Sequence, residues 1–287
     1  MAQLRQARNS VDIEGILSEA EFREGTGKSG NWISATFKIE VTEDNVIPVY
    51  AFASERKKDG TPNKIYRSLR TAQEEFKSIA VHGKEGADRV RVRSASLGES
   101  SFWTKDENLI TMWRVNSNFI TRVDSPNGFS PAATFEVEGF VAKIIPETKQ
   151  GEETGRLIVT LIVPIFGGRV DLIDFIVSNP KAVAFVESHY QRGDTVKFAG
   201  NIRINEVIER REEEVAFGDP IIREFTRTTR ELIVTSGSEA YTDERAFDPN
   251  EIKEALAARQ AYLESLKNKE KPKADTSKKN DFNFSFL

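Results

Sequence analysis

The sequence of 287 residues contains no cysteine and only two histidines, and these absences exclude several kinds of site. Without thiols the chain forms neither disulfides nor thiolate zinc sites, and this lack is typical of a reducing cytoplasm. His82 and His189 are too far apart for the usual metal-ligand spacings. Two histidines also provide no basis for a Ser/His/Asp arrangement. We therefore expect no resident metal and no cofactor.

Long hydrophobic runs are lacking as well. The apolar runs are much shorter than the roughly 20 residues that a helix needs to span a membrane. The first ten residues are polar and lack the hydrophobic block of a signal peptide. These features predict a soluble, cytoplasmic protein without a membrane partner. The net charge of −4 weakens the case for a nucleic-acid partner, but phosphate binding depends on a local positive track rather than on the sum.

Two short segments resemble enzyme motifs without meeting their requirements. Residues 25–29 (GTGKS) are similar to the end of a phosphate-binding loop, but Phe22 stands where that motif needs its first glycine. A helix should follow such a loop, whereas the pattern here predicts a strand. Asp171 and Asp174 would point to opposite faces of a strand and so do not form a metal pair. We expect that the chain is not an enzyme.

The most informative feature is an internal repeat with an offset of about 124 residues. Residues 11–17 (VDIEGIL) align with residues 135–141 (FEVEGFV), and both segments alternate apolar with acidic side chains. Alternation with period two predicts a half-buried strand. Gly15 and Gly139 occupy the same place in the two copies, and a glycine inside a strand is typical of a bulge or a sharp bend.

The repeat continues through both halves of the chain in the order strand, strand, strand, helix, strand, strand. The predicted elements of the first copy are residues 11–17, 33–41, 46–53, 66–80, 89–95 and 109–123. Those of the second copy are residues 135–141, 157–165, 169–177, 180–190, 195–204 and 223–234. Five strands with a helix between the third and fourth is the layout of the OB-fold, a partly open Greek-key barrel.

On this element order, the two glycines and the repeat, residues 8–236 resemble a tandem OB-fold single-stranded DNA-binding protein. The resemblance is to the kind encoded by phages, similar in arrangement to replication protein A. It implies an all-β fold with minor α content: two five-stranded OB-fold barrels in tandem, followed by a C-terminal amphipathic helix and a disordered tail. The expected domains are residues 8–125, residues 132–267 with the helix, and a tail at residues 268–287. The resemblance also implies the host cytoplasm as location if a phage encodes the chain.

The C-terminal segment carries its own signals. Asp248 and Pro249 are typical of a helix N-cap and first helical position, and apolar residues then recur on one face up to residue 267. Residues 268–280 lack apolar periodicity, which predicts a disordered linker. The last residues resemble the tails by which bacterial and phage single-strand binding proteins dock replication and recombination partners, although only one acid precedes the aromatics. The predicted docking residues are Phe282, Phe284, Phe286 and Leu287; the alternative is that this tip packs on its own or a neighbouring barrel.

An OB-fold binds single strands across its second and third strands, and binding without sequence choice needs aromatic platforms and cations. If Ile33 and Phe37 face the core, then Trp32 and Lys38 face outward by alternation. Trp103, in a polar hairpin, is the best stacking candidate, although each tryptophan could equally belong to the core. The predicted contacts comprise Lys28, Trp32, Lys38, Arg89, Arg91, Arg93, Phe102, Trp103, Lys105, Arg114, Arg203 and Arg227.

The second copy is less well equipped for nucleic acid. Its strands are apolar on both faces, which indicates burial against another element, and its long hairpin is rich in glutamate. The expected function is non-sequence-specific binding and protection of single-stranded DNA, with RNA as an alternative ligand and homo-oligomerisation left open. Two rivals remain: a structural or assembly protein of the virion type that uses OB barrels for protein contacts, and an accessory subunit of a replication enzyme.

Overall fold

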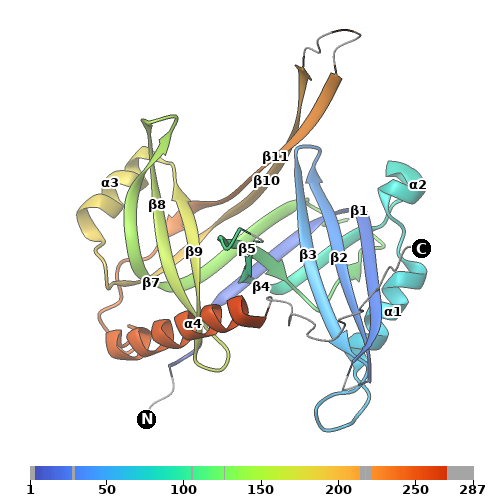
Figure 1. Cartoon of the computed structure of the whole chain (residues 1–287), viewed down its shortest axis with the longest axis horizontal. Coiled ribbons are helices and arrows are strands. Elements are labelled where there is room, and N and C mark those ends of the chain that lie inside the picture. Colours follow the sequence, from blue (N-terminus) through green and yellow to red (C-terminus); the bar gives the residue numbers. More distant parts are fainter. Residues whose placement is uncertain are drawn as a thin grey trace, which may run out of the picture.

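The structure is a computed structural model that describes residues 4–27, 30–104, 106–125, 127–213, 217 and 221–269. The prediction of a mostly β protein with few helices is confirmed (Figure 1). The first half contains β1 (Asn9–Gly27), β2 (Gly30–Thr42), β3 (Asn45–Ser54), α1 (Lys64–Glu75), α2 (Ile79–Gly86), β4 (Arg89–Trp103), β5 (Leu109–Asn116) and β6 (Thr121–Arg122). The second half contains β7 (Ala132–Lys149), β8 (Glu152–Ile165), β9 (Arg169–Val177), α3 (Pro180–His189), β10 (Thr195–Glu213), β11 (Ile221–Gly237) and α4 (Pro249–Lys269).

All the described strands belong to one continuous sheet, in which two sets of five close on themselves. In the first set β1 pairs with β2, β2 with β3, β3 with β5 in parallel, β5 with β4, and β4 with β1 again. We call this set the first ring. In the second ring β7, β8, β9, β11 and β10 follow each other in the same way, and β10 returns to β7. Helices α1 and α2 separate the third and fourth strands of the first ring, as α3 does in the second.

The two rings are joined by an antiparallel pairing between their first strands, β1 and β7. In this pairing Val11 lies opposite Phe135, and the sequence repeat aligns the same two residues. Two equivalent positions that pair antiparallel lie on an approximate twofold axis, so the rings are related much as the halves of a symmetric dimer are. The seam therefore places the two first strands in the centre of the molecule, with one ring on either side (Figure 1).

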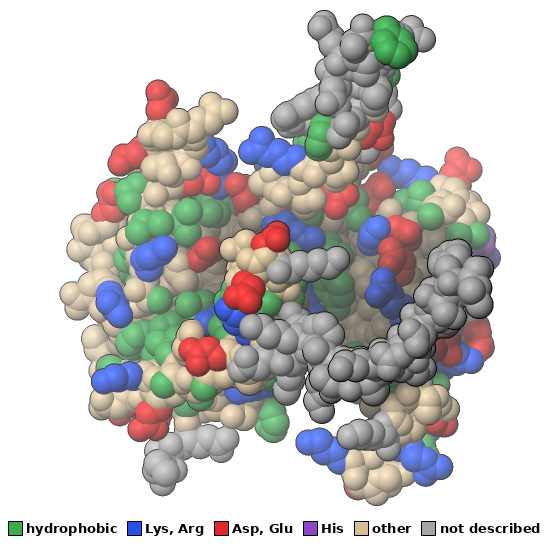
Figure 2. All heavy atoms as spheres, viewed as in Figure 1, with side chains coloured by type: hydrophobic (Ala, Val, Ile, Leu, Met, Phe, Trp, Pro, Cys, Tyr) green, Lys and Arg blue, Asp and Glu red, His purple; other side chains and the backbone are tan. Residues whose placement is uncertain are grey.

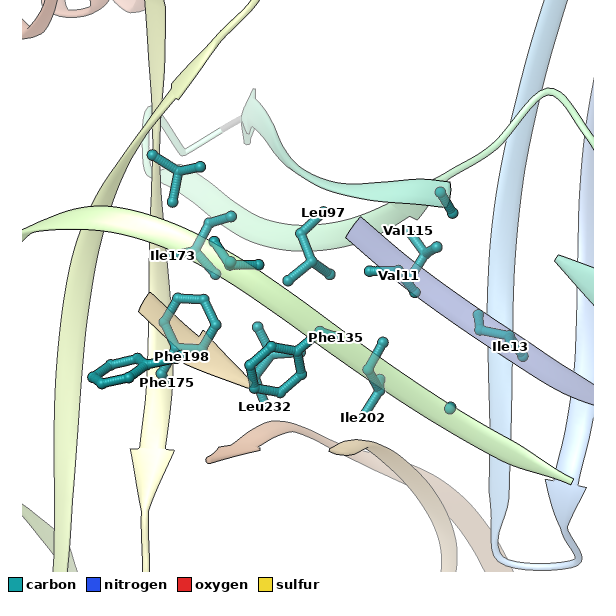
Figure 3. Packing of buried hydrophobic residues seen from close by; sticks show 14 of the residues in the cluster. Val11, Ile13, Leu97, Val115, Phe135, Ile173, Phe175, Phe198, Ile202 and Leu232 are labelled. Atoms are coloured by element: carbon teal, nitrogen blue, oxygen red, sulfur yellow. The ribbon is translucent and has the colours of Figure 1, made fainter. Parts of the chain in front are cut away.

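The hydrophobic core runs without interruption through this seam. Val11 and Ile13 of β1 are fully buried, as are Leu97 and Val115 from the same ring. They approach Phe135 of β7 and the aromatic cluster of the second ring, in which the Phe175 ring lies 5.3 Å from the Phe135 ring and 5.7 Å from the Phe198 ring (Figure 3). One shared core ties the rings into a single packed body, because removing either would expose the apolar side chains of the other.

Each first strand is bent by a bulge at the same place in the repeat. The register of β1 against β2 shifts between Leu17 and Glu19, and that of β7 against β8 shifts between Val141 and Lys143. An extra residue at such a point bends the strand and strengthens its twist, which a small ring needs in order to close. The bulges lie three residues beyond Gly15 and Gly139, so the glycines mark the bend without being the bulged residues.

Some element bounds differ from the sequence prediction. The expected helix over residues 66–80 is two helices, α1 and α2, because an extended residue, Phe76, ends the first. The expected strand over residues 109–123 is β5 and the short β6. Strands β10 and β11 are much longer than expected, since their pairing continues to Glu213 and Ile221. We call this extended ribbon, residues 203–213 and 221–230, the arm; it projects beyond both rings (Figure 1).

Helix α4 begins as predicted. Asp248 accepts a hydrogen bond from the Asn250 backbone N–H at 2.7 Å, and Pro249 occupies the first helical position. The helix packs against β9 of the second ring and also reaches β4 of the first. Part of β9 is therefore covered from within the chain. The helix continues to Lys269, two residues into the predicted tail, and the rest of that tail lies outside the described residues.

Candidate nucleic-acid interface

The outer side of β2 and β3 in the first ring carries side chains that the core leaves free to face solvent. Ile33 and Phe37 are buried, as predicted, so Trp32 and Lys38 point outward. On β3, the burial of Val49, Ala51 and Ala53 sends Tyr50 and Phe52 to the same outer side.

Three aromatic residues, Trp32, Tyr50 and Phe52, form what we call the aromatic face. Trp32 and Phe52 stack with ring centroids 6.0 Å apart and planes inclined by 28°. Trp32 pairs with Gly25 of β1, where a Cβ atom would lie 2.6 Å from the indole Cζ2. Glycine at this position therefore lets the indole lie flat across the strand. Phe52 remains 57% exposed, so a stacked aromatic pair is presented to solvent.

The sequence reasoning named Trp32 but missed Tyr50 and Phe52. The signal was present in the alternation of β3. Once Val49, Ala51 and Ala53 are assigned to the core, the residues between them must face the same side as Trp32. Any aromatic ring can stack on a base, so both side chains belong with Trp32 as candidate contacts.

Beside the aromatic face the arm encloses a groove of about 570 Å³. Its walls are the outer side of β1, β2 and β3 and the near side of the arm, which contributes Glu206, Thr226 and Arg230. Asn45 at the β2–β3 turn fixes the base of the arm: it donates to the Ile202 carbonyl at 3.1 Å and accepts from the Ile204 N–H at 2.8 Å. The groove therefore has walls from both rings.

Charges of both signs line this groove. Lys38 lies 2.6 Å from Glu19 and 3.7 Å from Glu21, and the hydrogen bond to Glu19 raises the pKa of Lys38. Arg203 lies 3.7 Å from Asp44. Arg227 faces away from the groove, because it alternates with Thr226, which lines it. Figure 2 shows Lys and Arg side chains interleaved with Asp and Glu side chains between the two rings.

The three arginines of β4 lie on one side of the strand, as predicted, and two of them pair with a buried carboxylate. Arg91 holds Glu14 through two hydrogen bonds of 2.8 and 2.9 Å, and Arg93 reaches Glu14 at 3.2 Å. The Arg89 guanidinium lies 5.7 Å from the centre of the Phe129 ring. Because Arg91 and Arg93 are held by Glu14, their guanidinium groups join β4 to β1 within the first ring, and their predicted contact with phosphate would have to compete with that carboxylate.

We expect acid to remove the contribution of Glu14 to stability. The hydrogen bond from Arg91 holds the pKa of Glu14 below its ordinary value of 4.5. The stabilisation is therefore complete above that pH and is lost as pH falls through the lowered pKa, because the unfolded chain takes up the proton first. Glu14→Gln should cost roughly 1.5–3 kcal/mol near neutral pH. Urea unfolding near neutral pH and near pH ~3 checks this; a cost that does not shrink in acid would contradict it.

The hairpin between β4 and β5 departs from expectation at Trp103. Phe102 is exposed, but the Trp103 indole N–H donates to the Leu263 carbonyl of α4 at 3.0 Å, and the Lys267 ammonium lies 5.1 Å from its ring. The structure thus places Trp103 against α4 rather than in an open hairpin. The contact was invisible in the sequence because it joins residues 160 apart. The Arg114 guanidinium lies 5.7 Å from the Tyr50 ring, next to the aromatic face.

The remaining predicted contacts fall outside the described residues. These are Lys28, Lys105, Phe282, Phe284, Phe286 and Leu287. Among the residues that the structure does describe, no cluster of three or more His, Asp or Glu side chains is arranged to hold a metal ion. In that same part of the chain, no helix combines the length and the apolarity that crossing a membrane requires.

The architecture is thus that of an all-β protein of two joined rings with an aromatic face and a groove between them. The chain belongs to the YorF family, whose sequence pattern it matches over residues 7–269. No curated protein matches it. Among solved structures, the chain is similar to a deletion mutant of the single-stranded DNA binding protein from Thermus aquaticus. The identity is 14%, the match covers 85% of this chain and 98% of that chain, and the TM-score is 0.48.

Proposed function

We propose that the chain binds single-stranded DNA without sequence preference on the aromatic face of the first ring. We interpret each ring as an OB-type barrel, and the pairing order together with the helix between the third and fourth strands supports this interpretation. OB barrels bind oligonucleotides on the second and third strands. The aromatic face occupies those strands, β2 and β3.

The observation that carries the proposal is the solvent-facing stack of Trp32 and Phe52. Two apolar rings on the outer side of β2 and β3 lose the stabilisation that burial would give them, whereas a bound base would restore it. Stacking of a base on an aromatic side chain contributes about 1–3 kcal/mol and tolerates every base. Lys38, Arg114 and Arg230 lie near enough to the face to accompany a phosphate backbone, so binding should weaken as salt rises.

The experiment is a titration of labelled dT oligomers, followed by fluorescence anisotropy, with duplex DNA as a control ligand. Trp32→Ala and Phe52→Ala should each lower affinity by roughly 5- to 150-fold, which corresponds to one lost stacking contact. The matched control is Phe185→Ala. Phe185 is also an exposed, stacked aromatic, 4.3 Å from the His189 ring, but it lies on α3 of the second ring. This control should bind as the unaltered protein does.

Failure of the unaltered chain to bind single strands would overturn the proposal and favour a structural role. The apolar strands of the second ring, which would have supported such a role, are covered in part from within the chain, because α4 packs against β9. Binding only in the presence of a replication enzyme would instead favour an accessory subunit. We further propose that the chain performs no chemistry and acts in the cytoplasm, where it protects strands during replication or recombination and recruits partners through its C-terminal aromatics.

A further inference from the structure

We propose that the bound strand continues from the aromatic face into a second contact surface, a cleft between α4 and the first ring. This inference rests on the proposed function and extends it to residues of α4 and of the β8–β9 turn, which the sequence did not indicate. The cleft, which we call the α4 cleft, has a volume of about 580 Å³, within the range of roughly 300–1,000 Å³ that ligand sites occupy. Its walls come from β4, β5, the β8–β9 turn and α4.

The α4 cleft and the aromatic face meet at β5. Tyr50 of the aromatic face lies opposite Asn116 in the pairing of β3 with β5, and the Arg114 guanidinium lies 5.7 Å from the Tyr50 ring. Both Asn116 and Arg114 line the cleft. They share the outer side of β5, because Val115 between them is buried. A strand that passes Tyr50 therefore meets these two side chains next, without crossing a barrier of core residues.

Exposed aromatic side chains from two different elements line the cleft. Phe166 stands in the β8–β9 turn and is 80% exposed. Tyr262, on α4, is 57% exposed. Gly167 and Gly168 follow Phe166 with φ values of +83° and +72°, a pair of left-handed residues that makes a tight hairpin turn and fixes where the phenyl ring projects. Rings held this way can stack on bases, as the proposal requires.

The charge balance of the cleft favours a polyanion. Glu99 is neutralised by Arg259, whose Nη2 lies 2.6 Å from its Oε1. This leaves Arg114 and Arg169 against Asp171, so cations outnumber carboxylates among the described residues that line the cleft. Arg114 also has a buried Nε without a hydrogen-bond acceptor in the described part of the chain. Two cations, aromatic rings and amide side chains are the groups that track a single strand.

The position of α4 also explains why the path would not run over the second ring. β9 corresponds in the repeat to β3, and α4 packs against β9. At the position equivalent to Tyr50, β9 carries an exposed acid, Asp174, so the second ring offers the strand a negative charge where the first ring offers an aromatic side chain. Arg259 with Glu99, and Trp103 with Leu263, hold α4 in this place, so the wall of the cleft is rigid.

The test compares dT oligomers of increasing length, from about 4 to about 16 nucleotides, the range that single OB barrels cover. Phe166→Ala combined with Tyr262→Ala should leave the affinity for the shortest binding oligomers unchanged. It should lower the affinity for the longest roughly 5-fold or more, equivalent to at least one lost stacking contact. Arg169→Gln should act in the same direction, and its matched control is Arg227→Gln, an exposed arginine that faces away from the groove. Because all these side chains are exposed, unfolding midpoints should be unchanged.

The failure of this inference is distinguishable from the failure of the proposed function. If the double variant binds every length as the unaltered protein does, while Trp32→Ala still weakens binding, the α4 cleft is not part of the path and the aromatic face remains the site. If the double variant weakens the shortest oligomers as strongly as the longest, the cleft is not an extension and the inference is overturned. If the unaltered chain binds no oligomer, both proposals fall.

Discussion

Gly15→Val is expected to prevent stable folding, and Gly15→Ala to cost at least about 3 kcal/mol of unfolding free energy, the upper end of what overpacking usually costs. A Cβ atom at this position would lie 2.4 Å from the Glu40 carbonyl oxygen and 2.8 Å from Ile39 Cγ2. The nearest of these atoms is backbone of β2, so it cannot rotate away. β1 pairs with β4 through Gly15 and with β2 from Ile16 onward. The whole closure of the first ring would therefore have to shift.

Urea unfolding followed by circular dichroism measures this cost. The matched control is Gly27→Ala at the end of the same strand, where a Cβ atom would meet nothing closer than 3.7 Å. Both substitutions change glycine to alanine in β1 without a positive φ, so they differ mainly in the space available. A cost at Gly15 no larger than at Gly27 would contradict the argument. It would mean that β2 can move away from β1 with little loss, and the first ring would then be less tightly closed than its pairings indicate.

The elements that the sequence predicted well are those whose signal is local. Alternation of period two located the first strands of both copies, and the repeat located their equivalents because a shared glycine marks the same bend. The start of α4 was predictable from Asp248 and Pro249. The pairing of Val11 with Phe135 could not be predicted, because a repeat does not indicate whether its two copies join through their first strands.

The parts of the site that were misjudged depend on contacts between distant segments. From the sequence, the arginines of β4 were expected to be available for phosphate, but Glu14 on a neighbouring strand forms hydrogen bonds with Arg91 and Arg93. The sequence predicts that Trp103 is an exposed hairpin residue, but its indole contacts α4, which lies near the other end of the chain. The sequence of one strand does not show which charges lie on the strands beside it. The residues that the structure adds to the candidate site are Tyr50 and Phe52, whose outward direction follows from the alternation of their own strand.

Arg259→Met is expected to destabilise the protein by about 3–5 kcal/mol, the usual cost of leaving a buried charge without its partner. Glu99 is 6% exposed and Arg259 17% exposed, and three hydrogen bonds of 2.6, 2.7 and 3.1 Å join them. Glu99 also accepts from the Leu172 N–H at 3.1 Å and lies beside Asp171, which accepts from the Glu99 N–H at 2.9 Å. Without the guanidinium, two carboxylates would share a site that burial already makes unfavourable for Asp171.

A double-mutant cycle separates this electrostatic effect from the loss of packing. Glu99→Gln keeps an acceptor for Leu172 and removes the charge, so Arg259→Met with Glu99→Gln should recover much of the stability that Arg259→Met loses. Lys267→Met is the control on the same helix. Its ion pair with Glu107, at 2.7 Å, is largely exposed, so its loss should cost less than about 1 kcal/mol. No recovery in the double variant would mean that Arg259 acts through its aliphatic stem alone. In that case apolar packing, rather than the buried ion pair, would keep α4 in place beside the cleft and against Trp103.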